Sequence, residues 1–152
     1  MINELDKEIL QRINFSERFL KSNMKYIKHE EDVPLFKKND ILSIFKKLPY
    51  PFNYVKGGAY AISKIYENYR FDLSFVISQN YPHLYLYVYK DDEIQQRGIN
   101  NFSYTLNFIE YNKSLLNKNF GLNSLDELKS YIIDIIDIFN DYVKEFVSQT
   151  KD

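Results

Sequence analysis

The 152-residue chain contains no cysteine and no tryptophan, and only four glycines and four prolines. Without cysteine the protein has no disulfide framework, no thiolate nucleophile and no cysteine-based zinc site. The scarcity of glycine and proline leaves little sequence for a disordered linker. The length is that of one ordinary domain, so we expect residues 1–152 to fold as a single domain.

Long apolar runs are absent as well. No run approaches the roughly 18 residues that a membrane-spanning helix needs. Residues 1–7 also carry charges where a secretion signal has its apolar core. These two observations predict a cytoplasmic protein without a membrane segment.

The net charge of −1 hides an asymmetry along the chain. Residues 1–64 carry twelve Lys and Arg against eight Asp and Glu, whereas residues 65–152 carry eight against thirteen. The two parts therefore have formal charges of +4 and −5. This asymmetry predicts a dipolar molecule.

Helical periodicity marks the N-terminal third. Apolar residues recur at steps of three and four and predict a helix over about residues 2–28, which should end before Pro34. A second helix is expected over about residues 40–48, with Asp40 as its N-cap and Pro49 after its end.

From residue 52 the period changes to the alternation of strands with one buried face. The expected strands span about residues 52–56, 59–66, 70–78, 83–90 and 102–111. Gly57 and Gly58 are typical of a tight hairpin turn. Residues 59–69 also fit helical spacing, so a short helix there is the alternative.

A long helix is expected at the C-terminus, over residues 124–149. Ser124 and Glu127 form a capping box, and a wide apolar face follows. The sequence thus predicts an α+β fold with two N-terminal helices, an antiparallel meander of three to five strands, and a long C-terminal helix packed on the sheet.

The sequence contains little that indicates catalysis. His29 and His83 do not have the spacing of metal ligands, and the Gly57-Gly58 pair lacks the rest of a nucleotide-binding motif. The acidic cluster at residues 91–93 is more typical of a solvated turn than of a metal site. We therefore expect no catalytic residue, no metal and no cofactor, and we favour a protein that is not an enzyme.

One strand carries an unusual row of aromatic residues. In residues 84–90 the leucine and valine side chains should point to one face of the sheet, and Tyr85, Tyr87 and Tyr89 to the other. Their expected neighbours on that face are Ser74, Ser78, Thr105 and Asn107. Such a row can bind a protein or stack single-stranded bases. Alternatively, the N-terminal helices cover it.

An acidic stripe is the second candidate surface. Asp126, Asp134, Asp137, Asp141 and Glu145 fall near one line on the last helix. The stripe is either the solvated side of an amphipathic helix or a surface that steers a basic partner. An opposing basic set lies in the N-terminal third and consists of Lys21, Lys25, Lys28, Lys37, Lys38, Lys46 and Lys47.

These observations favour a non-enzymatic module that binds a protein and acts by occluding it, as small bacterial immunity proteins, antitoxins and phage-encoded inhibitors do. The expected partner is a protein, with a basic toxin or effector as one candidate. The candidate partner-binding residues are Tyr85, Tyr87, Tyr89, Asp134, Asp137, Asp141 and Glu145. The alternatives are a single-stranded nucleic-acid-binding protein and an enzyme whose active site is assembled only in space. The sequence leaves the oligomeric state open.

Overall fold

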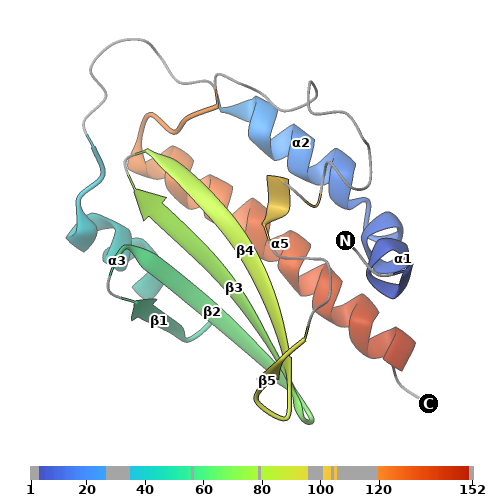
Figure 1. Ribbon diagram of the computed structural model, residues 1–152. Coiled ribbons are helices and arrows are strands. Elements are labelled where there is room, and N and C mark those ends of the chain that lie inside the picture. Colours follow the sequence, from blue (N-terminus) through green and yellow to red (C-terminus); the bar gives the residue numbers. More distant parts are fainter. Residues whose placement is uncertain are drawn as a thin grey trace.

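The computed structural model describes residues 4–26, 35–55, 57–78, 80–95, 101–103, 105 and 120–150. Three helices come first: α1 (Glu4–Arg12), α2 (Phe15–Lys25) and α3 (Lys38–Lys46). The strands follow as β1 (Phe52–Val55), β2 (Ala59–Tyr66), β3 (Tyr69–Ser78), β4 (Tyr81–Lys90) and β5 (Glu93–Ile94). Helix α5 (Leu125–Thr150) is the last element (Figure 1). The predicted α+β fold is confirmed.

The sheet is an antiparallel meander in which strand order follows chain order, β1-β2-β3-β4-β5. Residues 59–66 form strand β2, so the alternative of a short helix there is wrong. The predicted glycine hairpin is present, because Gly57 and Gly58 have φ angles of 111° and 97° between β1 and β2. A side chain at Gly58 would also bring its Cβ within 3.3 Å of the Ile77 carbonyl oxygen.

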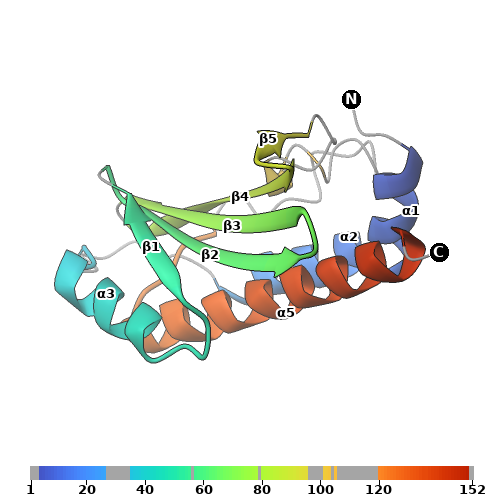
Figure 2. The same ribbon diagram turned by 90° about the horizontal axis from the view of Figure 1, so that it is seen from below.

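The molecule has two layers, a sheet and a layer of helices (Figure 2). Helix α5 runs along one face of the sheet, and α2 and α3 lie on the same side as α5. Helix α5 therefore packs on the sheet of its own chain. No described helix covers the other face of the sheet, which we call the outer face.

The core lies between the inner face of the sheet and α5. It includes the fully buried side chains Ile62, Phe71, Leu73, Phe75, Ile132, Ile135, Phe139 and Phe146. The rings of Phe71 and Phe146 meet edge to face with centroids 5.0 Å apart. Each such side chain contributes about 1.5–3 kcal/mol through burial, so this inner layer supplies most of the stability of the fold.

The N-terminal helix predicted over residues 2–28 is wrong in one respect, because it is two helices. Asn14 adopts the left-handed conformation (φ 55°, ψ 44°) between α1 and α2. Asparagine tolerates this conformation better than most residues, and a left-handed residue ends a helix. Asp6 of α1 is buried and accepts a hydrogen bond of 2.8 Å from the Tyr142 hydroxyl. Residues 1–3 and 27–28 lie outside the described residues.

The predicted start of the second helix also needs correction. Helix α3 begins at Lys38, and its N-cap is Lys37, which makes no side-chain capping bond. Asp40 therefore lies in the first turn, where its carboxylate still interacts favourably with the positive end of the helix dipole. The helix ends at Lys46, two residues before the predicted end.

The strand predicted over residues 102–111 is wrong at the residues the structure describes. Phe102, Ser103 and Thr105 are helical, and only Asn101 makes a single bridge to Tyr85 of β4. The turn is held by Asn101, whose side-chain Oδ1 accepts the Ser103 N–H at 2.9 Å and whose carbonyl accepts the Thr105 N–H at 2.9 Å. Residue 104 and residues 106–111 lie outside the described part of the chain.

Burial gives the physical reason for this turn. The Phe102 ring packs edge to face against Phe15 and Phe19 of α2, with centroids 5.3 and 5.6 Å apart. Thr105, predicted beside the tyrosine row, is buried in the turn instead. Asn107, the other predicted neighbour, lies outside the described residues.

The start of α5 was predicted correctly. The Glu127 N–H donates to the Ser124 Oγ at 3.1 Å, as a capping box requires. In the usual capping box, the glutamate side chain accepts the backbone N–H of the capping serine. Here Glu127 Oε1 accepts the backbone N–H of the preceding residue, Asn123, at 3.2 Å. Both bonds satisfy amide groups that a helix start would otherwise leave unpaired.

Candidate protein-binding face

The outer face is built by the alternate residues of the meander that point away from α5. On β4 the inward Leu84, Leu86 and Val88 are 2–3% exposed, whereas the tyrosines between them are half-buried. The predicted orientation of the tyrosine row is therefore confirmed. The outer face consists of Asn53, Val55, Ala59, Ala61, Ser63, Ile65, Arg70, Asp72, Ser74, Val76, Tyr81, His83, Tyr85, Tyr87, Tyr89 and Ile94.

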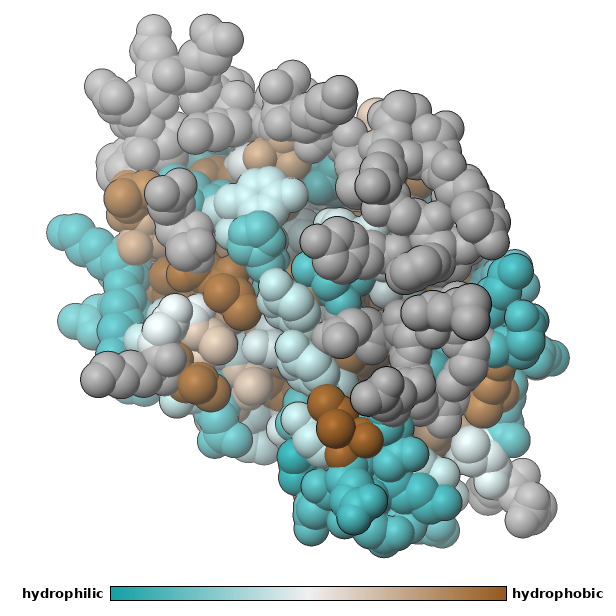
Figure 3. All heavy atoms as spheres, viewed as in Figure 1, coloured by the Kyte–Doolittle hydropathy of each residue, from teal (hydrophilic) through white to brown (hydrophobic). Residues whose placement is uncertain are grey.

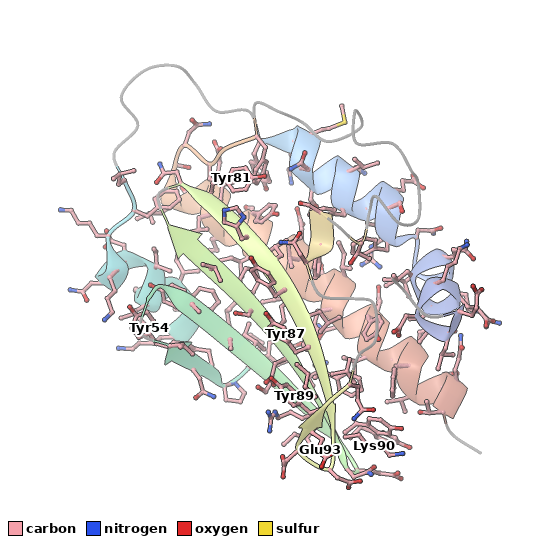
Figure 4. The ribbon with its side chains drawn as sticks, in the orientation of Figure 1. Tyr54, Tyr81, Tyr87, Tyr89, Lys90 and Glu93 are labelled. Carbon is pink, nitrogen blue, oxygen red and sulfur yellow. The ribbon has the colours of Figure 1, made fainter. Side chains whose placement is uncertain are left out.

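The alternative that the N-terminal helices cover the tyrosine row is wrong for the described helices. Both α1 and α2 pack against α5: α2 lies in the helical layer, and α1 lies beyond the end of the sheet and not over the tyrosine row (Figures 1 and 2). The labelled Tyr87 and Tyr89 lie on the side of the sheet that faces the viewer in Figure 4. The described helices therefore leave the tyrosine row uncovered.

The tyrosine row is ordered by contacts within the sheet. The rings of Tyr85 and Tyr87 are parallel within 2°, with centroids 6.2 Å apart. Partial burial raises the pKa of the Tyr87 phenol, with smaller contributions from Tyr85 and Tyr89. The Tyr87 hydroxyl is therefore harder to ionise than that of an exposed tyrosine, and in its protonated form it can both donate and accept hydrogen bonds.

Arg70 fixes the end of the row. Its guanidinium carbon lies 4.1 Å from the centre of the Tyr89 ring, which is a cation–π contact. Arg70 also donates to Asp72 at 3.3 Å and to Asp92 at 3.2 Å. The Ser63 hydroxyl donates to Asp72 at 2.6 Å. This network joins β2, β3, β4 and the turn after β4 at that end of the face.

Small residues lie parallel to the tyrosine row, two strands away. One row of the register runs across the sheet from Ala61 through Ser74 to Tyr85. The next outward row runs from Ser63 through Asp72 to Tyr87. We call Ala59, Ala61 and Ser63 the small strip of β2. The outer face therefore carries small side chains along β2 and large side chains along β4.

Exposed aliphatic side chains border this surface. Val55 is 54% exposed, Ile65 75% and Ile94 54%, and all three belong to the outer face. Figure 3, which looks onto this face, shows hydrophobic atoms at separate places near its border and paler atoms of mixed character between them.

One end of the sheet is acidic. The β2–β3 turn and the β4–β5 turn lie side by side, because the Asp91 N–H donates to the Asn68 carbonyl at 2.9 Å and Asn68 Nδ2 donates to Asp91 Oδ1 at 3.1 Å. We call Glu67, Asp91, Asp92 and Glu93, all exposed, the acidic tip. The acidic cluster of residues 91–93 is therefore part of a solvated turn.

The acidic stripe of α5 contacts α1 and α2. Asp141 pairs with Arg18 at 2.8 Å, and Asp134 lies 3.8 Å from the Lys25 ammonium. Glu145 pairs with Arg12 at 3.3 Å. These carboxylates thus form an ion-paired seam between helices, rather than a stripe directed away from the molecule.

Asp137 and Asp126 complete that stripe, and both are exposed. Asp137 lines a shallow groove of about 290 Å³ between α2 and α5, together with Arg18, Lys21 and Lys25. The structure thus separates the two predicted surfaces: the tyrosines lie on the outer face, and the stripe lies among the helices.

The lysines of the basic set lie away from the tyrosine row. Those that are described belong to α2 or to α3 and the residues next to it, on the helical side of the sheet. Lys38 lies 4.1 Å above the ring of Tyr54, which points inward from β1. Lys28 lies outside the described residues.

Sequence reasoning missed Asp72 and the small strip of β2 as parts of the surface. The strand pattern placed each of them on a face, but only the strand register shows that they lie beside the tyrosines. Hairpin turns of known length fix such a register. The two-residue turn at residues 67–68 was the signal that could have located them.

The described residues contain no group of three or more histidine or acidic side chains that could hold a metal ion. His83 is exposed on the outer face, with its ring 4.9 Å from that of Tyr81, and His29 lies outside the described part of the chain. A cavity of about 10 Å³ lies beneath Tyr81, against Phe19 and Phe102, and has room for about one water molecule.

Two further findings concern the chain as a whole. Within the described ranges, no helix has the length and apolar character needed to span a membrane. Comparisons of the sequence and structure with protein-family models, with curated proteins and with solved structures found no match.

Proposed function

We propose that this protein is a non-enzymatic binding module whose outer face covers, and thereby occludes, a surface of a partner protein. The main support for this proposal is a sheet face that no described helix covers. This face presents an ordered row of tyrosines between exposed aliphatic residues. Tyrosine gives a large contact area at a small entropic cost and keeps a hydroxyl for hydrogen bonds.

The order already present in the face favours tight binding. Tyr89 is held under Arg70, and Asp72 connects Arg70 to Ser63. Side chains that are fixed before binding lose little conformational entropy when a partner arrives. The Arg70 network therefore supports the tyrosine row as a preformed anchor.

Charge favours a basic protein over nucleic acid as the partner. Arg70 is the one Lys or Arg among the described residues that point outward from the sheet, and it is already paired with Asp72 and Asp92. Lys90, beside the acidic tip, is outnumbered there by four carboxylates. The acidic tip at the same end would repel phosphates and attract a cationic surface. A basic toxin or effector, neutralised as immunity proteins, antitoxins and phage inhibitors neutralise their targets, fits this surface.

Site-directed photo-cross-linking tests the proposal, and the absence of native cysteine makes the labelling specific. Ile65→Cys places a benzophenone maleimide on the outer face, and Ile133→Cys places it on the exposed side of α5. In a lysate of the native host we expect one protein adduct from position 65 that is absent from position 133. Adding Tyr87→Ala should remove this adduct, since a central aromatic anchor contributes most of the binding energy.

The purified partner then tests occlusion. We expect the wild-type protein to abolish the partner's activity at a 1:1 molar ratio, whereas the Tyr87→Ala variant does not. Equal adducts from positions 65 and 133, or none from position 65, would contradict the proposal. Tyr87-dependent binding of a single-stranded oligonucleotide at low salt would replace it with nucleic-acid binding.

A further inference from the structure

We infer that the outer face holds one arginine side chain of the partner protein, whose guanidinium stacks on the Tyr87 ring and pairs with Asp72. The inference rests on the proposed function and deepens it, because it names the side chain that the tyrosine row recognises. It is supported by the orientation of the rings, by a similar contact within the same sheet, by the short side chains beside the row and by the local charge.

The rings of the tyrosine row favour a flat cation. Tyr85 and Tyr87 are parallel within 2°, so a planar group that stacks on one ring is parallel to the other as well. Arginine has a planar, delocalised charge that is weakly hydrated and stacks on aromatic faces, whereas the lysine ammonium is compact and strongly hydrated. The row is therefore better matched to arginine than to lysine.

Arg70 already makes this kind of contact one register row away. Its guanidinium carbon lies 4.1 Å from the centre of the Tyr89 ring, and its Nε donates to Asp72 at 3.3 Å. Tyr87 and Tyr89 are successive outward residues of β4 (Figure 4), and Asp72 is the register partner of Tyr87. An arginine of the partner on Tyr87 would repeat the arrangement, with Asp72 as the carboxylate between the two guanidinium groups.

Asp72 can accept a further hydrogen bond. One of its oxygens accepts the Ser63 hydroxyl at 2.6 Å, and the other accepts Arg70 Nε at 3.3 Å. An ionised carboxylate has about four acceptor positions, so two described bonds do not saturate it. The Asp72 side chain is 19% exposed. A partner's guanidinium can therefore reach it.

Short side chains beside the row leave room for the arginine to approach. Directly opposite residues of an antiparallel pair have Cβ atoms about 4.5–5.5 Å apart, so Ser74 lies against Tyr85 as Asp72 lies against Tyr87. On the far side of β3 the same two rows continue with Ala61 and Ser63. Among the described residues, the tyrosine rings thus stand above their neighbours on the β2 side, from which a long side chain can reach Tyr87.

The local charge favours a cation. Two carboxylates, Asp72 and Asp92, share the single guanidinium of Arg70. With the rest of the acidic tip and Lys90, five carboxylates stand against two cations, a formal charge of −3. Such a field attracts a cationic side chain and repels a phosphate, and salt screens the attraction.

A blocked peptide tests the site without the partner. The probe is acetyl-Gly-Arg-Gly-amide, titrated by NMR into protein with isotope-labelled tyrosine rings. We expect the Tyr85 and Tyr87 ring signals to shift with a dissociation constant in the millimolar range. The matching lysine peptide should bind about fivefold more weakly, and the citrulline peptide, which is planar but uncharged, about tenfold more weakly. Equal binding of all three peptides, or no binding of the arginine peptide, would overturn the inference.

Variants locate the bound arginine. Tyr87→Leu keeps apolar bulk but removes the aromatic face, and we expect the dissociation constant to rise about fivefold. Tyr87→Phe keeps the ring and should bind like the wild type. Tyr81→Leu is the matched control, because Tyr81 is an outer-face tyrosine of the same strand at the end away from the acidic tip, and it should leave the affinity unchanged. Circular dichroism melting curves must show that each variant is folded; a folded Tyr87→Leu protein with wild-type affinity would also overturn the inference.

The carboxylate gives a separate readout. Asp72→Asn should weaken the arginine peptide about fivefold and reduce the salt dependence of its binding, since one charge of the site is lost. An unchanged affinity would remove Asp72 from the site. The two proposals also fail separately. An adduct at position 65 without binding of the arginine peptide would overturn the arginine site alone, whereas peptide binding without any adduct would contradict the proposed function.

Discussion

The inner and outer faces of the sheet are built by the same strands, yet they have different chemistry. On β3 and β4 the inward positions are leucine, phenylalanine, valine and isoleucine at 7% exposure or less, apart from the strand ends. The outward positions of the same strands are tyrosines, serine, an arginine–aspartate pair, Val76 and His83. The inner face therefore holds the fold together, while substitutions on the outer face should cost little stability.

Neighbouring residues on β3 give the most direct test of this difference. Leu73 is fully buried, and Leu73→Ala should cost about 2–5 kcal/mol of unfolding free energy, because it leaves a cavity under α5. Ser74, the next residue, points outward, and Ser74→Ala should change stability by about 0.5 kcal/mol or less. Urea unfolding measures both, and equal costs would show that the outer face is also part of the core.

Titration separates a core tyrosine from an outer-face tyrosine. Complete burial raises the pKa of Tyr131 strongly above its ordinary value of 10, with smaller contributions from Tyr81, Asp134 and Tyr26. A raised pKa means that the folded protein retains a proton that the unfolded chain loses. Stability is therefore full below pH 10 and falls above it, by up to about 1.4 kcal/mol per pH unit.

Tyr131→Phe should flatten this alkaline loss of stability, and Tyr87→Phe should flatten it less, because partial burial on the outer face shifts the Tyr87 pKa less strongly. Denaturant unfolding between pH 9 and 11 measures the slopes. Identical slopes for the two variants would place the two tyrosines in equivalent surroundings and contradict the two-face description.

The sequence was sufficient to predict the buried face of β3 and β4 and the start of helix α5. Alternation between residues 71 and 90 gave the strands and their buried sides, and Ser124 with Glu127 gave the start of α5. Both signals are local, because a strand's period and a cap depend on residues close in the chain.

The features that sequence reasoning missed depend on contacts distant in the chain. The left-handed Asn14 lets α1 and α2 each lie against α5, and the helical turn at Phe102 exists because that ring packs on Phe15 and Phe19. The acidic stripe was predicted correctly as a line of carboxylates. Its ion pairs with Arg12, Arg18 and Lys25 could not be predicted without the helix packing.

Loss of one outer tyrosine should separate binding from folding. Tyr87→Ala removes a half-buried ring, and we expect it to cost about 1 kcal/mol of unfolding free energy. The same change should weaken binding of the partner by at least about 2 kcal/mol, since it removes a central aromatic anchor. Calorimetric titration with the purified partner, beside urea unfolding, gives both numbers. A stability loss as large as that of Leu73→Ala would make Tyr87 a core residue.

The ion-paired seam between α2 and α5 lies outside both faces and should contribute least. Arg18 and Asp141 are 30% and 51% exposed, and exposed pairs contribute about 0–1 kcal/mol because water and salt screen them. A double-mutant cycle with Arg18→Gln and Asp141→Asn should therefore give a coupling free energy below about 1 kcal/mol that decreases with added salt. A larger, salt-independent coupling would mean that the seam positions α2 on α5, and it would assign the stripe carboxylates to folding instead of binding.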